Sequence, residues 1–356
     1  MLKRPVPTLD HLVTMTDDVG MVQHAARDVP NRSTGYCTDD IARAFMVALR
    51  ASEFERDRER AQRLAEVYLS FLHDAQLPDG TFHNFMGYDR HWLDDVGTPD
   101  SIGRAIWGLG FGMRYAPRES WRRLCGEMLD RALPNVPDLG HARAFAYAGL
   151  GLSHACIARG STDRGIARAL EGLIEEFKAR HREHSDPQWD WFEPVMTYDN
   201  ARLCEVLLRA GSALGDDAAV NLGMRTLRFY ESIVFEHGMF VPIGNAGWYP
   251  RGGQRARYGQ QPLEAASLVD VELFAETLDD ALKLPGVRHA HLAEVALDWF
   301  SGRNTRNVDM VIGGGCRDGL EELGLNVNMG AESTLAYLSS AFALAERPRA
   351  LRLSSA

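Results

Sequence analysis

The chain has 356 residues, of which 45% are hydrophobic, so it can bury a large core either in two ordinary domains or in one large closed architecture. Its formal net charge is −10 at pH 7, and the 39 Lys and Arg residues are scattered along the chain. Nucleic-acid-binding proteins gather such residues into a basic patch or stripe, so this class is excluded.

The sequence predicts neither a membrane-spanning segment nor a signal peptide. No run of 18 apolar residues occurs, and Pro5 and Pro7 precede any apolar stretch long enough for a signal peptide. We therefore expect a cytoplasmic protein with no membrane association. The five cysteines are separated by 31 residues or more, which suits neither a disulfide framework nor a zinc cluster, so we expect reduced and mostly buried thiols.

Helical periodicity dominates the chain, and strand-like runs are few and short, with "GMFVPIG" at 238–244 among the better ones. Two kinds of predicted helix alternate strictly. One kind is apolar nearly all round, as buried helices are; it is predicted at 39–51, 100–115, 140–158, 198–215, 262–278 and 330–346. The other kind has a charged face; it is predicted at 57–76, 118–133, 163–182, 217–234 and 286–300, with residues 8–15 as a sixth member.

The starts of the apolar helices recur every 40 to 70 residues or so, which indicates stacked helical hairpins. Six hairpins favour a closed ring. The sequence therefore predicts one all-α domain over residues 1–356, an (α/α)6 barrel with six parallel inner helices and six antiparallel outer helices. An open α-solenoid is the rival architecture, although solenoid repeats are usually more even in length.

The longest insertions each precede an inner helix and should emerge at the same end of the barrel. They occupy residues 77–99, 183–197, 236–261 and 303–329, and they are rich in Trp, Tyr, His, Asp and Gly. Long loops on a rigid scaffold commonly carry function, so a binding pocket is expected at this rim.

Acidic residues recur in the first turn of five inner helices, in "TDDIAR", "TPDSIGR", "TYDNAR", "QPLEAA" and "MGAEST", while the remaining helix offers His141 and Arg143. Helix capping would explain any single copy. In a closed ring, however, the six helix starts surround one axis, and gathered carboxylates are costly unless chemistry or a polar ligand requires them.

Three arginines follow these acids by about one turn, close enough to pair with them and to keep some of them ionised. The expected pairs are Asp40 with Arg43, Asp100 with Arg104, and Asp199 with Arg202. Some of the acids are therefore expected to be structural and others to be available for function.

Cleavage of a glycosidic bond needs one protonated and one ionised carboxyl group, and the predicted pocket offers several. Glu193 has apolar neighbours on both sides, which favours the protonated form, so it is the candidate general acid. Asp40, Asp100 and Glu264 are candidates for the ionised partner because each opens an inner helix, and Asp199 is a further catalytic candidate.

Carboxylates combined with exposed aromatic rings form the usual surface for sugars, so carbohydrate is the expected ligand class. The residues expected to bind substrate are His24, Tyr36, Asp39, Arg43, Trp92, Arg104, Trp191, Tyr198, Gln261 and Glu332. No cofactor and no metal are expected, since "DDxxD" is absent and the His and Cys residues lack ligand spacing.

The strings "TDDVGMVQHA", "GYCTDDIARA", "TPDSIGRAIWGLG", "WFEPVMTYDNARL", "QQPLEAA" and "NMGAESTLAYL" resemble a bacterial family of helical-barrel proteins encoded beside, or fused behind, retaining family-4-type glycosyltransferases. The resemblance covers essentially the whole chain and implies a glycosyltransferase as a partner. The chain is also similar to the wider (α/α)6 group of glycoside hydrolases, polysaccharide lyases and N-acylglucosamine 2-epimerases. The epimerases rely on paired histidines, whereas the inner-helix starts here offer only His141.

Three functional hypotheses follow. The first is a glycoside hydrolase that cleaves an oligosaccharide with two carboxyl groups. The second is a non-catalytic sugar-binding partner of a glycosyltransferase, and the third is a sugar epimerase or isomerase. Product formation separates the hypotheses, because only the two enzymes change the sugar.

Overall fold

The computed structural model of the chain describes residues 4–160, 163–281 and 287–353. The helices of this part are α1 (Asp10–Thr14), α2 (Thr38–Ser52), α3 (Arg58–Ala75), α4 (Pro99–Tyr115), α5 (Glu119–Ala132), α6 (Ala142–Arg159), α7 (Arg164–His184), α8 (Ala201–Leu214), α9 (Asp217–Val234), α10 (Pro262–Ala281), α11 (Val287–Asp298) and α12 (Ala331–Leu353). Two short 3₁₀ helices, Arg32–Thr34 and Leu133–Asp138, complete the helical segments of these ranges.

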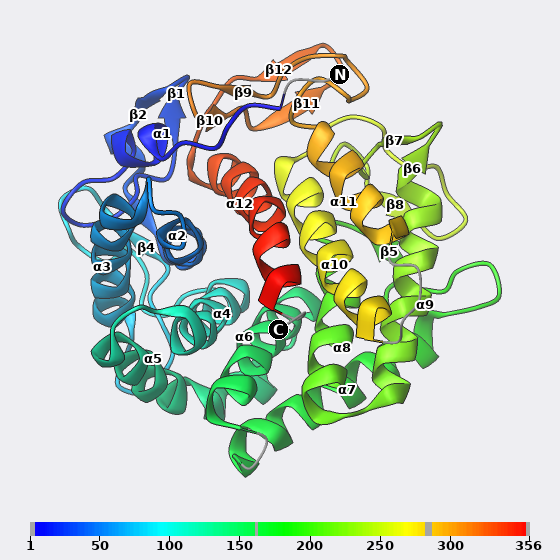
Figure 1. Cartoon of the computed structure of the whole chain (residues 1–356), viewed down its shortest axis with the longest axis horizontal. Coiled ribbons are helices and arrows are strands. Elements are labelled where there is room, and N and C mark those ends of the chain that lie inside the picture. Colours follow the sequence, from blue (N-terminus) through cyan, green and yellow to red (C-terminus); the bar gives the residue numbers. More distant parts are fainter. Residues whose placement is uncertain (1–3, 161–162, 282–286, 354–356) are drawn as a thin grey trace.

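The even-numbered helices form an inner ring that closes on itself. Each of them packs against the next in chain order, and α12 packs against α2 (Figure 1). Helices α3, α5, α7, α9 and α11 each pack on the outside of the inner helix that precedes them, and α1 packs against α12. The predicted (α/α)6 barrel is therefore confirmed, and the open solenoid is excluded. None of the helices in the described ranges combines the length and apolar character that crossing a bilayer requires.

The observed helix boundaries differ from the predicted ones by a few residues at most elements. The largest difference at the end of an inner helix is at α12, predicted to residue 346 but observed to Leu353, and the largest at the start is at α8, predicted from residue 198 but observed from Ala201. Asp199 has a φ of 50°, a left-handed conformation that an α-helix cannot contain, so the helix begins after it. The sixth outer helix is only the five-residue α1. Residue 286, the predicted start of another outer helix, lies outside the described residues.

The inner helices are buried over nearly their whole circumference, as their all-round apolar sequences predict. In α6, every residue from Ala142 to Cys156 is buried. Helices α4 and α6 approach closely through glycines: a Cβ atom on Gly151 would lie 2.3 Å from the carbonyl oxygen of Ile106. All five cysteines are free and buried, as expected.

Short antiparallel strand pairs lie in the loops that precede the inner helices. The strands are β1 (Ala25–Ala26), β2 (Val29–Pro30), β3 (Tyr36–Cys37), β4 (Phe85–Met86), β5 (Val195–Met196), β6 (Phe235–Glu236), β7 (Met239–Phe240), β8 (Tyr249–Pro250), β9 (Val311–Ile312), β10 (Gly315–Cys316), β11 (Gly319–Glu321) and β12 (Gly324–Asn326). The strand-like run predicted at 238–244 is thus reduced to the two residues of β7.

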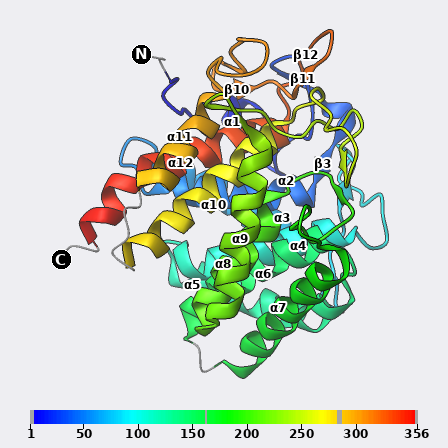
Figure 2. The same ribbon diagram turned by 90° about the vertical axis from the view of Figure 1, so that its right-hand side faces the viewer.

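Two of these pairs join neighbouring hairpins. β3 pairs with β4, which joins the loop before α2 to the loop before α4, and β5 pairs with β8, which joins the loop before α8 to the loop before α10. A bridge between Gln260 and Leu320 links the next two loops. The strand β3 and the loops beside it lie at the end of the barrel opposite the C-terminus of α12 (Figure 2).

Candidate functional site

The acids at the start of α2 and α4 do not serve as side-chain caps. The N-cap residue of α2 is Cys37, whose side chain makes no capping bond. The N-cap residue of α4 is Thr98, whose hydroxyl oxygen accepts a hydrogen bond from the Ser101 amide at 3.3 Å. The carboxylates of Asp39, Asp40 and Asp100 are therefore available for other contacts.

A cavity of about 370 Å³ lies at the N-terminal ends of α2, α4 and α12, and we call it the rim cavity. Its volume falls in the range of small-molecule sites. Six of the predicted site residues line it: His24, Asp39, Asp40, Arg43, Asp100 and Glu332. Ring closure has thus brought together side chains that are as much as 308 residues apart in the chain, from His24 to Glu332.

Arg43 holds three of these carboxylates together. Its guanidinium lies 2.9 Å from a carboxylate oxygen of Asp39, 3.0 Å from Asp40 and 2.9 Å from Glu332. One cation is therefore shared among three acidic groups, two from α2 and one from α12. Such a group can compensate only part of their mutual repulsion.

Asp40 is the buried member of this set, at 3% exposure. Burial raises the pKa of its carboxyl group to about 7; Arg43 opposes the shift and the neighbouring Asp39 adds to it. A carboxyl group with a pKa near neutrality can hold a proton at physiological pH and donate it in a reaction. Among the rim-cavity acids, Asp40 thus has the property of a general acid.

Asp100 is held in place by Tyr198. The phenolic hydroxyl of Tyr198 donates a hydrogen bond of 2.6 Å to Asp100. Burial, together with this hydrogen bond, raises the pKa of Tyr198 well above its usual range, so the hydroxyl remains a donor. Tyr198 thereby acts as a positioning residue for the Asp100 carboxylate.

Loop 303–329 supplies a further wall of the cavity. The side-chain amide nitrogen of Asn328 lies 3.3 Å from Asp318 and 3.3 Å from Nδ1 of His24, and its carbonyl oxygen accepts the Ala25 amide at 2.8 Å. Ser333 donates a hydrogen bond to Asp318. These contacts tie the N-terminal segment to the last long loop.

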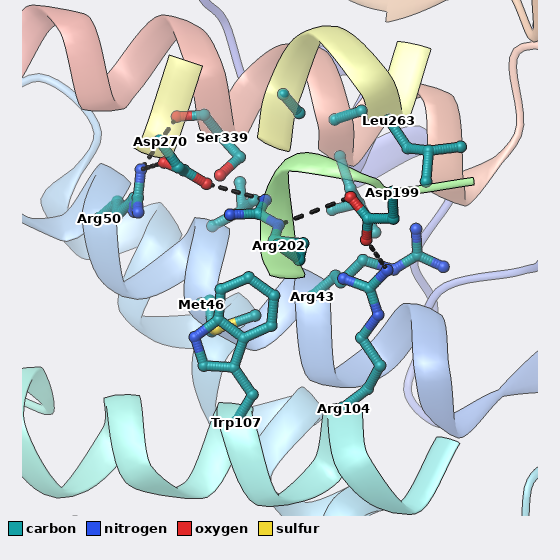
Figure 3. A pocket seen from close by; sticks show the side chains of 14 residues that line it. Arg43, Met46, Arg50, Arg104, Trp107, Asp199, Arg202, Leu263, Asp270 and Ser339 are labelled. Atoms are coloured by element: carbon teal, nitrogen blue, oxygen red, sulfur yellow. Dashed lines mark hydrogen bonds and ion pairs between the residues drawn. The ribbon is translucent and has the colours of Figure 1, made fainter. Parts of the chain in front are cut away.

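A chain of ion pairs fills the barrel interior below the rim cavity (Figure 3). Asp199 lies 2.7 Å from Arg104 and 3.6 Å from Arg202, and Asp270 lies 3.0 Å from Arg202 and 3.1 Å from Arg50. The enclosed space among them is only about 40 Å³, too small for a sugar ring.

These two acids are held ionised. Burial alone would raise their pKa values, but Arg104 and Arg202 lower the pKa of Asp199, and Arg50 and Arg202 lower that of Asp270 to about 2. Asp199 is thus placed in a structural ion-pair network. The predicted pairs of Asp40 with Arg43 and of Asp199 with Arg202 are present, whereas Arg104 reaches Asp39 and Asp199, not Asp100.

Glu264 supports the turn that precedes α8. Its carboxylate accepts the backbone amide of Asp199 and the hydroxyl of Tyr230, the latter at 3.1 Å. Burial and the charge of Asp199 raise the pKa of Glu264 to about 7. The geometry therefore gives Glu264 a role in holding the Asp199–Asn200 backbone.

Glu193 does not occupy the apolar setting that its neighbours in sequence suggested. Its carboxylate pairs with the guanidinium of Arg143, which also donates to the Tyr198 carbonyl at 2.8 Å. Trp191 and Phe192, which flank it in the chain, are buried and pack against each other. The apolar side chains face the core and the carboxylate faces a cation, because neighbouring residues in an irregular segment need not point the same way.

Two predicted sugar-binding aromatics are buried. Trp191 is fully buried against Tyr230, with ring centroids 5.7 Å apart, and Tyr36 is buried and donates a hydrogen bond of 2.7 Å to Asp17. Neither offers a free ring face to a ligand, so these two assignments are corrected. Trp92 is partly buried and stacks on His83 at 4.7 Å.

Gln261, another predicted binding residue, directly precedes α10, and its carbonyl oxygen accepts the amide of Glu264 at 3.2 Å. Several cavity residues, on the other hand, were not singled out in the sequence: Gln23, Asn84, Thr98, Asp318 and Asn328. Most of them lie within or beside the long rim loops, and this position in the sequence was the feature that could have identified them as cavity residues. Their exact positions depend on strand pairs such as β3–β4, which sequence periodicity does not reveal.

No family model matches the chain, and no curated protein matches it in sequence. Solved structures do resemble it. They include cellobiose 2-epimerase from Bacillus thermoamylovorans, with a TM-score of 0.71, 11% identity and 96% of each chain covered. D-mannose isomerase has a TM-score of 0.66 at 9% identity over 94% of each chain. An α-mannanase from Bacteroides thetaiotaomicron has a TM-score of 0.63 at 11% identity, covering 96% of this chain and 95% of that one.

At these identities the likeness defines the fold and nothing finer. The chain is an (α/α)6-barrel protein, in agreement with the closed ring of its own helices.

Proposed function

We propose that this protein is a carbohydrate-active enzyme and, more narrowly, a glycoside hydrolase that works in the rim cavity with two carboxyl groups. The observation that carries the proposal is the convergence of acids from α2, α4 and α12 on one cavity, where the pKa of Asp40 is raised to about 7. The names of the similar structures, an epimerase and an isomerase of sugars and a mannanase, support a carbohydrate ligand.

In the proposed reaction, Asp40 is the general acid and donates its proton to the glycosidic oxygen as the bond from that oxygen to the anomeric carbon breaks. Asp100, oriented by Tyr198, is the ionised partner. It either takes a proton from the attacking water or attacks the anomeric carbon itself, depending on its separation from Asp40 in the complex. Glu193, whose carboxylate is engaged by Arg143, is not needed for the acid step.

Other groups of the cavity have the chemistry for sugar recognition. Asn328, His24 and Asn84 supply hydrogen-bonding groups for hydroxyls, and Phe85, 37% exposed, offers an apolar face for sugar C–H groups. Arg43 and Glu332 add charged contacts at the same wall.

The test is incubation of the protein with a panel of gluco- and manno-oligosaccharides, followed by mass spectrometry and anomer analysis by NMR. Hydrolysis predicts shorter products, and the anomer formed first distinguishes inversion from retention. If the panel shows binding but no change of any sugar, the hydrolase proposal fails.

A sugar epimerase or isomerase is the second candidate. It is favoured by His24, whose ring nitrogen lies beside Asn328 at the cavity and could move a proton next to a carbonyl group. Two of the similar structures carry such names. Incubation of cellobiose or mannose in D₂O decides: this reaction incorporates deuterium beside the carbonyl carbon without shortening the sugar.

A non-catalytic sugar-binding partner of a glycosyltransferase is the third candidate, supported only by the sequence resemblance. It predicts that no wild-type preparation forms product and that oligosaccharides bind with measurable heat in calorimetry. Co-purification with a glycosyltransferase encoded beside it would support this role.

A further inference from the structure

A second group of chemically active side chains lies away from the rim cavity, where α9, α10 and α11 pack together. Glu231 on α9, Glu272 on α10 and His289 on α11 are all buried. One possible ligand atom from each lies within 4.8 Å of the others. Among the residues that the structure describes, this is the one group of three His, Cys, Asp or Glu residues with that geometry.

The donor atoms face one another. Nδ1 of His289 lies 2.6 Å from Oε2 of Glu272 and 4.0 Å from Oε1 of Glu231. Arg288 contacts both oxygens of the Glu231 carboxylate: it pairs with Oε2, and its Nη1 lies 3.5 Å from Oε1. Oε1 of Glu231 therefore lies near both the guanidinium and Nδ1 of His289.

Glu272 provides an independent sign of a ligand. Glu272 has no exposed surface, and its buried Oε1 atom has no hydrogen-bond partner among the described residues. A buried carboxylate oxygen without a partner costs free energy, and such groups in native proteins call for an explanation. A cation bound between the three side chains supplies one.

We propose that Glu231, Glu272 and His289 form a site for one divalent transition-metal ion, with Zn²⁺ as the best match, that joins α9 and α11 to α10. One imidazole nitrogen and two carboxylate oxygens are donors that Zn²⁺ accepts at about 2.0–2.2 Å, with water as the usual fourth ligand. Small side-chain shifts suffice, because the three donors need to be roughly 3 to 3.5 Å apart around such an ion.

Neighbouring charges suit this site. On the far side of the His289 ring, Nε2 lies 3.5 Å from a carboxylate oxygen of Asp279. A metal-bound histidine typically donates its second N–H to a carboxylate, which fixes the ring for coordination through the first nitrogen. The positive groups that face the cluster are Arg288 and Arg228, and the side chain of Arg288 is 52% exposed, so solvent screens much of its repulsion.

Protons are the alternative occupants of this cluster. Burial raises the pKa values of Glu231 and Glu272 to about 7 and about 8, so the carboxyl groups can share protons when no cation is bound. Metal binding then releases protons and weakens as the pH falls. A cluster that only shares protons binds no metal at any pH.

The direct test uses the untagged full-length protein after treatment with EDTA and gel filtration. Equilibrium dialysis against micromolar ZnCl₂ with elemental analysis should give one Zn²⁺ per chain, and Zn²⁺ should raise Tm by several degrees where Mg²⁺ does not. Co²⁺ in place of Zn²⁺ should give visible absorption bands of a low-symmetry site with nitrogen and oxygen ligands. Less than a tenth of an equivalent of either metal would overturn the proposal.

Variants locate the site. Glu272→Gln and His289→Asn should each weaken Zn²⁺ binding at least tenfold. His181→Asn is the matched control, because His181 is also buried and lies 2.6 Å from one carboxylate, that of Asp190, but no second carboxylate of the described residues lies in an equivalent place. Zinc binding that survives in His289→Asn, or that is lost in His181→Asn, would place the metal elsewhere. If a variant does not fold, the stoichiometry and Co²⁺ spectrum of the wild-type protein still decide.

Discussion

Asp40 and Asp199 are both aspartates near the starts of inner helices, yet the pKa of Asp40 is raised and that of Asp199 is lowered. Both are buried, so desolvation raises the pKa of each. The difference lies in the number of guanidinium groups available. Asp40 pairs with one guanidinium, that of Arg43, which it shares with Asp39 and Glu332, whereas Asp199 pairs with two, those of Arg104 and Arg202. Arg104 and Arg202 also contact other acids, so it is the number of guanidinium groups beside each carboxyl group that separates the raised pKa of Asp40 from the lowered pKa of Asp199.

Asp40→Asn should remain folded and bind oligosaccharide but turn it over at least ~10²-fold more slowly, because the general acid is lost. In the wild type, kcat should fall as the pH rises above about 7, where Asp40 loses its proton. Initial rates across pH 5 to 9 measure both effects. Asp10→Asn, an exposed acid on α1, is the control and should match the wild type. An unchanged rate in Asp40→Asn would remove this residue from the mechanism.

Glu193→Gln tests the alternative acid. We expect turnover within about threefold of the wild type but a lower Tm, because the buried Arg143 guanidinium loses its carboxylate partner and such breaks are destabilising. Rates and thermal unfolding of the same preparation give the two quantities. A loss of rate comparable to that of Asp40→Asn would return the acid role to Glu193.

At the scale of elements, the positions of the helices could be predicted from the sequence, whereas the residues at which they begin and end could not. A 3.6-residue apolar period specifies which segments are helical and which are buried, and this sufficed for all six inner helices. The end of a helix depends on one or two backbone angles, as the left-handed Asp199 shows at α8. The burial of Trp191 and Tyr36 could not be predicted from the sequence either, because an aromatic residue in a loop can pack into the core as easily as it can face a ligand.

The contact between α4 and α6 makes a sharp prediction about packing. Gly151→Ala should destabilise the protein by about 1–3 kcal/mol or more, since its Cβ atom would collide with backbone atoms of Ile106 and Trp107. Gly172→Ala on α7 is the matched control: its Cβ would meet open space, and alanine favours the helix by up to about 1 kcal/mol. Urea unfolding of the two variants should show shifts of opposite sign. Equal shifts would mean that the two inner helices are not in close contact.

At the scale of the whole molecule, ring closure explains why side chains from distant parts of the sequence could be predicted to lie at one candidate site. It placed Asp40, Asp100 and Glu332 at one cavity although they come from three hairpins. The contributions of Asp318 and Asn84 were not predicted, because loop conformation depends on strand pairs between hairpins. The Glu231, Glu272 and His289 cluster has no sequence motif either, since its members come from three helices and meet only through packing.

Stability should fall as the pH rises from about 4 to about 7. Asp and Glu titrate near 4 in an unfolded chain, and burial raises the pKa values of Asp40 and Glu264 to about 7 in the folded chain. Between these values the folded chain binds protons that the unfolded chain has released, so each such group costs up to about 1.4 kcal/mol per pH unit.

Urea unfolding at pH 5, 6 and 7.5 measures this slope, and Glu264→Gln should make it shallower because the amide does not titrate. A wild-type stability that increases over the same range would show that these two carboxyl groups are ionised in the folded protein.

Strand pairs or a bridge join the rim loops before α2 and α4, before α8 and α10, and before α10 and α12. The Ala331 amide donates a hydrogen bond of 2.9 Å to the Gln23 carbonyl, where the last hairpin meets the first segment. Gln23 and His24 therefore share a wall with Asn328 and Glu332, which the ribosome adds some 300 residues later. During synthesis, the acids of α2 and α4 lack their final neighbours until α12 has been synthesised. Completion of the rim cavity is thus a late event in the synthesis of each chain, and a nascent chain that stops before α12 lacks one wall of that cavity.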